Sequence, residues 1–317
     1  MQRRRFIQIM ATSIAGLSLG QSLGARSLQA LRWRGYTLGT EGQFTLYCQR
    51  PAQAQRTLDA CFAEIRRLES LFSLYDDQSQ ICQLNRSGTL VNPAPEWQPL
   101  LQAIDRAHKQ TAGLFDPTIQ ALWKTYQAHF QAHAQSRSGP NADALQTALA
   151  RTGWQHVEHS EHAIHFQHPG MALSLNGIAQ GYITDRIAQI LQDAGYGQVL
   201  IELGETRALG QHPDQRPWQL GIQDANDRSQ IAQIAELENQ ALATSGSYGS
   251  RFSEDGTFHH LIHPQTGRPG NSWKSLSVIA PSATEADALS TGLSFASRKQ
   301  IQQLQQAHAQ IQVITQS

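Results

Sequence analysis

Helical and extended segments are mixed along this chain without a regular alternation, and their order constrains the fold strongly. Apolar residues at steps of three and four predict amphipathic helices. These helices span 53–72, 97–111, 141–153, 177–194, 284–297 and 299–308. Short β-type runs are predicted at 45–48, 198–203, 218–222, 276–280 and 311–314. Because a parallel α/β sheet requires repeated strand–helix–strand units, this order favours an α+β fold in one domain.

Charge and hydropathy exclude two broad classes of protein. The 317 residues include 25 Lys and Arg and 25 Asp and Glu, so the formal net charge is zero. This balance argues against a nucleic-acid-binding protein, whose affinity comes largely from neutralising phosphates. Mean hydropathy is −0.42 and the one long apolar run lies at the N-terminus. We therefore expect no polytopic membrane protein and no membrane span in the mature chain.

The three cysteines, Cys48, Cys61 and Cys82, are too few for a disulfide framework, and their spacing matches no zinc site. Either one pair forms beside a free thiol, or all three are buried thiols.

The first 30 residues have the pattern of an export signal. Arg3-Arg4-Arg5-Phe6-Ile7-Gln8 precedes a mostly apolar stretch that ends near Leu23. A charged start before a short apolar run is typical of secretory signals, and the paired arginines resemble the twin-arginine type. An amphipathic helix at the start of the fold is the alternative. We expect a twin-arginine signal over 1–30, a folded domain over 31–317 and a periplasmic location.

Asp287 and Thr291 are four residues apart in a predicted helix, so they share one face. A carboxylate and a hydroxyl suit a hard cation such as Mg²⁺, which prefers oxygen ligands. Alternatively, Asp287 faces solvent and Thr291 bonds back to its own helix.

Other segments contain residues that are common at nucleotide sites. The small residues 244–246 would let main-chain N–H groups approach phosphate, and Gly177 precedes a helix whose N-terminus attracts anions. His260 could act as a general base, and Phe115 and Asp116 could contact a planar ring or sugar. Ordinary turns, a polar strand end and a core Phe are the alternatives.

The order of these motifs resembles the ApbE family, the FAD:protein FMN transferases. The series runs through Ser73-Leu-Tyr75, Gly113-Leu-Phe-Asp-Pro-Thr118, Asn176-Gly-Ile-Ala-Gln-Gly-Tyr182, Ala243-Thr-Ser-Gly246, His260-Leu-Ile-His-Pro-Gln-Thr-Gly267 and Ala286-Asp287 with Thr291. The signal and the wording Gly-Glu-Thr-Arg-Ala-Leu-Gly are most similar to its NosX branch, which is linked to maturation of the nitrous oxide reductase system.

The resemblance implies a single ApbE-type domain of helices and mostly antiparallel strands. It also implies an enzyme that binds FAD and Mg²⁺, cleaves the pyrophosphate and joins FMN to a Thr or Ser of a partner protein, with release of AMP. For the NosX branch, the expected acceptor is a membrane flavoprotein of the NosR type.

The resemblance assigns roles by position. The metal would be held by Asp287, Thr291 and the carbonyl of Gly177, and His260 would be the base. Contacts to FAD are implied for Leu38, Tyr75, Leu114, Phe115, Asp116, Ser174, Gln180, Thr244, Ser245, Gly246 and Ile262.

The chain departs from the family pattern at four places. Ser174 replaces a frequent Asp, Gln180 replaces Lys or Glu, and His263 replaces Asp before Pro264. Gly204-Glu205-Thr206 stands where the family often has Gly-Gly-Asp. Ser174 and Gln180 can still hydrogen-bond the same groups. Ser174, Gln180 and His263 keep one alternative open, a periplasmic FAD-binding chaperone without catalysis. An FAD pyrophosphatase, which would pass FMN and AMP to water, is a second alternative.

Overall fold

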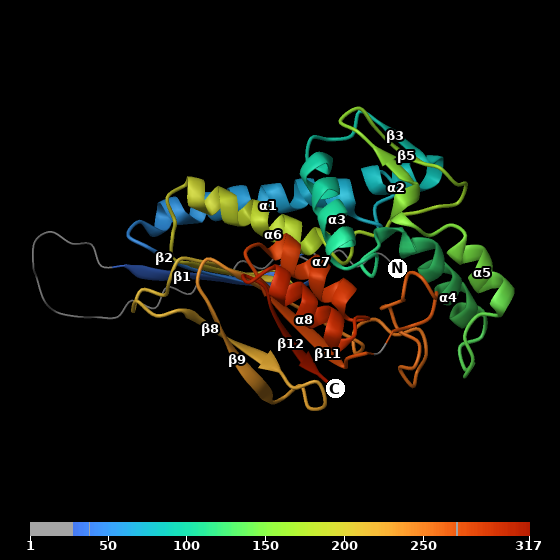
Figure 1. Ribbon diagram of the computed structural model, residues 1–317. Helices are drawn as coiled ribbons and strands as arrows, with labels where there is room; N and C mark the ends of the chain where they lie inside the picture. The colour runs from blue at the N-terminus through green and yellow to red at the C-terminus, as the bar shows by residue number, and fades with distance from the viewer. Residues whose placement is uncertain (1–27, 38, 271) are drawn as a thin grey trace, which may run out of the picture.

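A seven-stranded antiparallel sheet forms the centre of the molecule. The computed structural model describes residues 28–37, 39–270 and 272–317 (Figure 1). The strand order is β1-β2-β6-β7-β10-β11-β12, and every neighbouring pair is antiparallel. These strands are β1 (Gln29–Thr37), β2 (Thr40–Cys48), β6 (Val199–Glu202), β7 (Thr206–Leu209), β10 (Ala241–Gly246), β11 (Ser275–Ala280) and β12 (Gln312–Gln316).

Both faces of this sheet are covered, which explains why every residue of β11 is buried. Leu276 and Val278 point to the side where helices pack, whereas Ile279 points to the side covered by a two-stranded hairpin. The covering helices are α1 (Pro51–Phe72), α6 (Ala179–Asp193), α7 (Ala283–Leu293) and α8 (Arg298–Ala307), and the hairpin is β8 (Trp218–Gln223) with β9 (Ile231–Leu237). The strand reads Ser-Leu-Ser-Val-Ile-Ala, so apolar or small residues lie on both of its buried faces.

The remaining elements extend the helical side of the molecule (Figure 1). They comprise α2 (Gln80–Ser87), α3 (Trp97–Gln110), α4 (Gln120–Ala132), α5 (Ala142–Leu149), a small sheet of β3 (Thr89–Val91), β4 (Val157–His159) and β5 (Ala163–Phe166), and the 3-10 turns Pro117–Ile119 and Trp154–His156. Leu122 and Tyr126 of α4 form an apolar cluster with Ala148 of α5.

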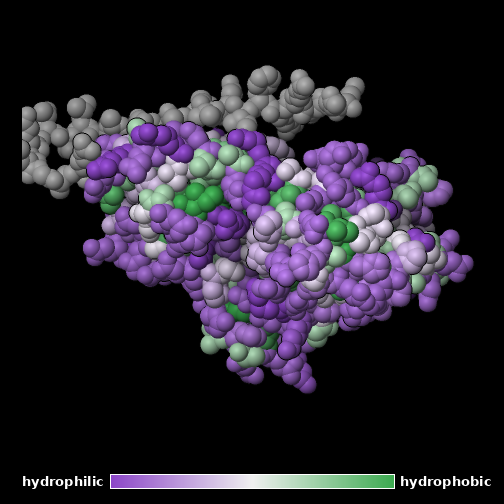
Figure 2. Space-filling view, turned by 90° about the horizontal axis from the view of Figure 1, so that it is seen from above, coloured by the Kyte–Doolittle hydropathy of each residue, from purple (hydrophilic) through white to green (hydrophobic). Residues whose placement is uncertain are grey.

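The α+β prediction is confirmed, with antiparallel strands throughout the sheets. The six predicted helices lie close to their predicted ranges, whereas α2 and α4 were not predicted. All three cysteines are free: Cys48 and Cys61 are buried, and Cys82 is half-buried. The face seen in Figure 2 is mostly hydrophilic, with apolar residues in small separate patches. Among the described residues, none of the helices has the length and apolarity needed to cross a bilayer. The predicted export signal falls on residues 1–30, of which 1–27 lie outside the described residues.

Candidate functional site

A cavity of about 260 Å³ lies where segments from much of the chain meet. It is lined by Phe115, Asp116, Pro117, Ile119, Trp123, Ser174, Asn176, Gly177, Gln180, Glu205, Thr244, Ser245, Gly246, Tyr248, Gly249, His260, Leu261, Asp287 and Thr291. A wider cavity of about 510 Å³ shares Asp116 and extends to His108 and Gln265. The smaller cavity contains the chemically distinctive residues of the sequence motifs, so we take it as the candidate site.

Helix α7 brings Asp287 and Thr291 to the cavity, as their spacing predicts. Asp287 is buried, and its Oδ2 accepts a hydrogen bond of 3.0 Å from the main-chain N–H of Gly181 on α6. A Cβ atom added at Gly177 would lie 2.8 Å from Oγ1 of Thr291, so the main chain at Gly177 passes directly beside that hydroxyl. The three positions assigned to a metal by resemblance are therefore neighbours in space.

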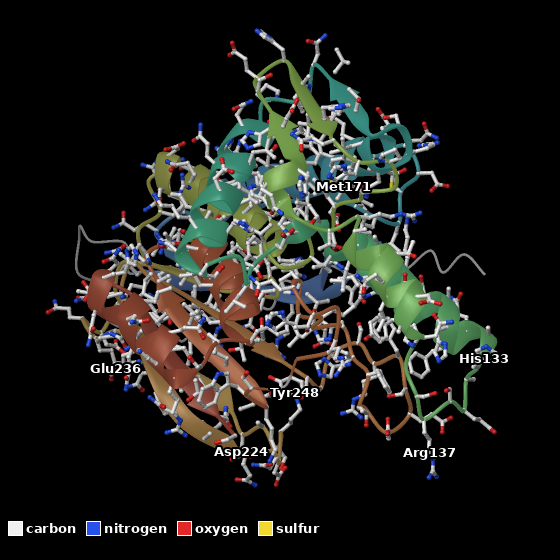
Figure 3. The ribbon with its side chains drawn as sticks, turned by 45° about the vertical axis from the view of Figure 1, so that its right-hand side comes forward. His133, Arg137, Met171, Asp224, Glu236 and Tyr248 are labelled. Carbon is white, nitrogen blue, oxygen red and sulfur yellow. The ribbon has the colours of Figure 1, made fainter. Side chains whose placement is uncertain are left out.

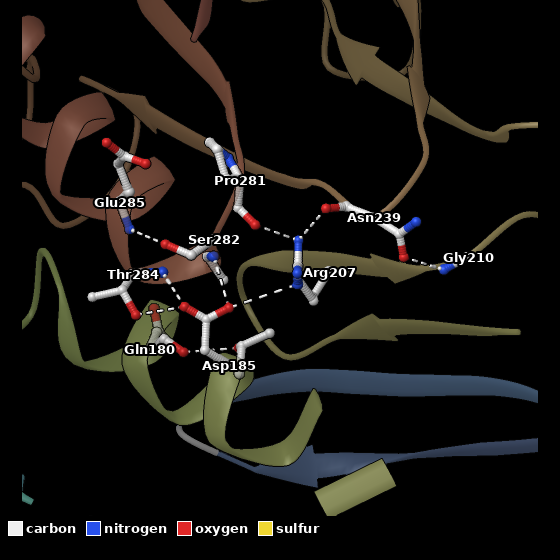
Figure 4. A network of polar contacts seen from close by, with 11 residues as sticks. Gln180, Asp185, Arg207, Gly210, Asn239, Pro281, Ser282, Thr284 and Glu285 are labelled. Atoms are coloured by element: carbon white, nitrogen blue, oxygen red, sulfur yellow. Dashed lines mark hydrogen bonds and ion pairs between the residues drawn. The ribbon is translucent and has the colours of Figure 1, made fainter. Parts of the chain in front are cut away.

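The N-terminus of α7 is fixed by Asp185 of α6 (Figure 4). The Asp185 carboxylate accepts from the N–H of Ala283 at 2.9 Å, and from the N–H and hydroxyl of Thr284 at 2.8 and 2.6 Å. The Nε atom of Arg207 lies 3.7 Å from the same carboxylate. These contacts satisfy N–H groups that a helix end leaves unpaired, and they set the position of α7 relative to α6.

The small residues 244–246 end strand β10 rather than forming the turn that their composition suggests. Ser245 and Gly246 pair in the ladder with Leu276 and Ser275 of β11. The Ser245 hydroxyl lies 2.8 Å from Oγ of Ser290 and 3.4 Å from Oγ1 of Thr291. Residues 244–246 therefore reach the cavity as the end of a strand, and not as a loop.

His260 has the geometry of a neutral base. Its Nδ1 lies 3.1 Å from the carbonyl oxygen of Ser250, an acceptor only, so Nδ1 carries the proton and Nε2 keeps its lone pair. Burial, followed by the charge of His259, lowers the pKa of His260. Gly249 leaves room for the ring, since a Cβ atom there would lie 2.5 Å from Cε1 and 3.0 Å from Nε2 of His260.

The carboxylate of Asp116 is occupied by hydrogen bonds within the protein. Its Oδ1 accepts from the N–H and hydroxyl of Thr118 at 2.8 and 2.6 Å, and its Oδ2 accepts from the N–H of Trp154 at 2.9 Å. The neighbouring Phe115 packs against α7, because a Cβ atom at Gly292 would lie 2.8 Å from its Cβ. Asp116 thus holds this wall in shape, and its contact with FAD stays a prediction.

Two buried carboxylates meet at the cavity. Burial, together with the charge of Asp287, holds the pKa of Glu205 well above its usual range. Burial is also the main cause of the raised pKa of Asp287, while the Gly181 N–H opposes that shift. Oε2 of Glu205 has no hydrogen-bond partner among the described residues. A site with two buried carboxylates, one of them with an unpaired oxygen, beside a threonine hydroxyl fits a divalent cation with oxygen ligands.

No group of three or more His, Cys, Asp or Glu side chains that could hold a metal occurs within residues 28–37, 39–270 and 272–317. The donors assigned by resemblance are of another kind: one carboxylate, one hydroxyl and one main-chain carbonyl.

Three of the predicted contact residues are not among the residues that line the cavity. Leu114 is buried in the apolar cluster of α7 and α8, and Ile262 is buried beside Leu122 and Tyr126. Tyr75 is 90% exposed in the loop between α1 and α2 and is not among the residues that line the cavity. Leu38 lies outside the described residues. The structure brings the remaining predicted residues together at the cavity.

The cavity also contains residues that the sequence reasoning missed. Trp123 of α4 and Tyr248, which follows β10, supply aromatic rings. Figure 3 shows Tyr248 between the strands of the main sheet and the region of α4 and α5. The guanidinium of Arg228 lies 4.7 Å from the centre of the Tyr248 ring. An aromatic residue directly after a run of small residues was the available signal for Tyr248.

Comparisons with known proteins agree with this arrangement. The model of the ApbE family matches residues 38–315. A protein of Treponema pallidum named FAD:protein FMN transferase is 30% identical over 277 residues, which cover 80% of this chain and 75% of the relative. Flavin transferase ApbE from Vibrio cholerae superposes with a TM-score of 0.78 at 25% identity, covering 91% of this chain and 93% of the other. The ApbE protein from Thermotoga maritima gives a TM-score of 0.79 at 26% identity, covering 90% and 94%. The chain therefore belongs to the ApbE family.

Proposed function

We propose that this chain is an FAD:protein FMN transferase. In the reaction, the hydroxyl oxygen of a Thr or Ser in an acceptor protein attacks the phosphorus of the FMN half of FAD. The bond between that phosphorus and the bridging oxygen breaks, and AMP leaves. The observation that carries the proposal is the joint placement of Asp287, Thr291 and His260 on one cavity. The names of the relatives support it.

His260 would receive the proton of the acceptor hydroxyl at Nε2. A threonine hydroxyl is a weak nucleophile and needs a base in reach. The hydrogen bond from Nδ1 to the Ser250 carbonyl keeps Nε2 available, and it stabilises the ring once the second proton has arrived.

Asp287, Thr291 and the main chain at Gly177 would hold Mg²⁺. When bound there, this ion would neutralise charge on the pyrophosphate oxygens. Trp123 and Tyr248 would cover a planar ring of FAD, since aromatic side chains stack on such rings.

The test is incubation of the purified chain with FAD and Mg²⁺, with and without an acceptor domain, followed by mass spectrometry. We expect a gain of the FMN mass on the acceptor and release of AMP only when the acceptor is present. Release of FMN and AMP without acceptor would indicate a pyrophosphatase instead. Retention of intact FAD in every sample would indicate a chaperone.

We also propose that the chain belongs to the NosX branch, is exported by the twin-arginine route to the periplasm and modifies a NosR-type flavoprotein. The support is the N-terminal Arg3-Arg4 pair and the similarity of wording at 204–210. Cell fractionation tests the route: replacing Arg3 and Arg4 with Lys should leave the protein in the cytoplasm. Co-expression with a NosR-type domain tests the acceptor by its added mass.

A further inference from the structure

Glu205 is a buried carboxylate for which the proposed reaction has no role. It lies in the turn between β6 and β7, where the N–H of Leu203 bonds the Glu205 carbonyl at 2.9 Å and Gly204 has a φ of +100°. The Glu205 residue is 9% exposed, and its side chain lines the cavity. Within the described chain, its Oε2 atom has no hydrogen-bond partner.

The basic residue nearest to Glu205 in the chain is committed elsewhere. Arg207 donates from Nη1 to the carbonyls of Asn239 and Pro281 at 2.8 and 2.6 Å, and its Nε faces Asp185 (Figure 4). Among the residues that line the cavity, His260 is the basic one. The charge that does act on Glu205 is the like charge of Asp287. Two buried carboxylates without a cation are unfavourable because each loses its hydration without an opposite charge.

The contacts around Gly181 show how the two acids come together. Gln180 lies against Gly204, since a Cβ atom added at Gly204 would be 2.9 Å from Nε2 of Gln180. The next residue, Gly181, donates to Oδ2 of Asp287. The turn that carries Glu205 and the helix that carries Asp287 are thus both packed on the first turn of α6.

We propose that the Glu205 carboxylate is a further oxygen ligand of the divalent cation held by Asp287 and Thr291, directly or through one water. This inference rests on the cation of the proposed function. A second carboxylate adds the negative charge that tunes the affinity of such sites. A divalent cation between the two acids would give the orphaned Oε2 atom of Glu205 a partner and would offset the like charge of Asp287.

The test compares wild type with Glu205→Gln, which keeps the size of the side chain and removes its charge. Isothermal titration with MgCl₂ measures cation affinity without FAD, and thermal unfolding is followed with and without Mg²⁺. We expect Glu205→Gln to bind Mg²⁺ at least about tenfold more weakly. We also expect it to unfold at a higher temperature than wild type without Mg²⁺, because the repulsion with Asp287 is removed. A merely structural role would not move these two readouts in opposite directions.

Glu202→Gln is the matched control. Glu202 ends β6, and its carboxylate accepts from Gln43 at 3.1 Å outside the cavity lining. This variant should bind Mg²⁺ like wild type. Should Glu205→Gln fail to fold, Glu205→Asp keeps the charge but withdraws the oxygens, and it should also weaken Mg²⁺ binding.

Equal Mg²⁺ affinity of wild type and Glu205→Gln would overturn the inference while leaving the transferase proposal intact. Absence of Mg²⁺ binding by wild type would overturn the cation assignment for both acids. The proposed function itself fails only if wild type transfers no FMN to an acceptor.

Discussion

The main-chain N–H of Gly181 on α6 points at Oδ2 of Asp287 on α7, at a distance of 3.0 Å. The two helices can approach this closely because residue 181 has no side chain. A Cβ atom there would lie 2.3 Å from the carbonyl oxygen of Ala283 and 2.8 Å from Cβ of Asp287. The glycine therefore sets the position of the proposed metal ligand.

Gly181→Ala is expected to destabilise the protein by about 1–3 kcal/mol, since overpacking forces the helices apart. The expected sign is informative, because Gly→Ala inside a helix ordinarily stabilises by roughly 0.5–1 kcal/mol. Urea denaturation measures the change. Gly197→Ala is the control, since a Cβ atom there would meet nothing within 4 Å. An increase in stability for Gly181→Ala would show that α6 and α7 do not pack as described.

Asp185→Ala is expected to lower the free energy of unfolding by about 0.5–2 kcal/mol, the usual effect of losing a helix cap. It should also reduce flavin transfer, because α7 carries Asp287 and is held through this carboxylate. Asp193→Ala is the matched control: Asp193 ends the same helix and accepts from Gln189 on its surface at 2.7 Å. Chemical denaturation and the transfer assay together check the prediction. Unchanged stability in Asp185→Ala would contradict the capping role.

Gly249→Ala is expected to displace the His260 ring without unfolding the protein. Gly249 is exposed and a Cβ atom there would lie 2.5 Å from Cε1 of His260. Transfer should fall by roughly 100-fold, the order of magnitude that misplacing a catalytic group by about 1 Å can cost. FAD binding, measured by flavin fluorescence, should be retained. Gly197→Ala again serves as control. Loss of FAD binding that parallels the loss of rate would make His260 a binding residue instead.

The acid side of the pH–rate profile tests the protonation state of His260. Burial and the charge of His259 lower the pKa of His260 below its ordinary value of 6.5. A base acts in its neutral form, so transfer should stay constant as the pH falls to 6.5 and decline only below it. His263→Ala is the control. It should leave the acid side of the pH–rate profile unchanged, since His263 packs on Phe295 and does not line the cavity. The profile is measured at saturating Mg²⁺, which keeps the carboxylates of Asp287 and Glu205 ionised; under that condition, a decline that begins above pH 6.5 would contradict the assignment.

Local patterns predicted six of the helices, although α2 and α4 were missed. The apolar residues from Leu58 to Phe72 lie on one buried face of α1, because a 22-residue helix that covers a sheet needs a continuous apolar stripe. The spacing of Asp287 and Thr291 likewise placed both on one face of α7. Such features depend on residues that are close in the sequence.

Features that depend on distant partners were not predicted. Residues 244–246 look like a turn from their composition, and only pairing with β11, about thirty residues later, makes them a strand. The position of Glu205 beside Asp287 arises from packing on α6. Tyr75 was assigned to FAD by resemblance, and no local pattern indicates that its side chain is exposed and absent from the cavity lining.

The walls of the cavity come from positions as far apart as Phe115 and Thr291. A fragment that ends before α7 would lack both proposed metal-binding side chains, and one that begins after α4 would lack the Phe115 wall. The cavity can therefore bind a ligand only after the segments from Phe115 to Thr291 have all folded. A bound dinucleotide would act as a crosslink between distant segments, so it should slow global unfolding more than it changes the motion of any single loop.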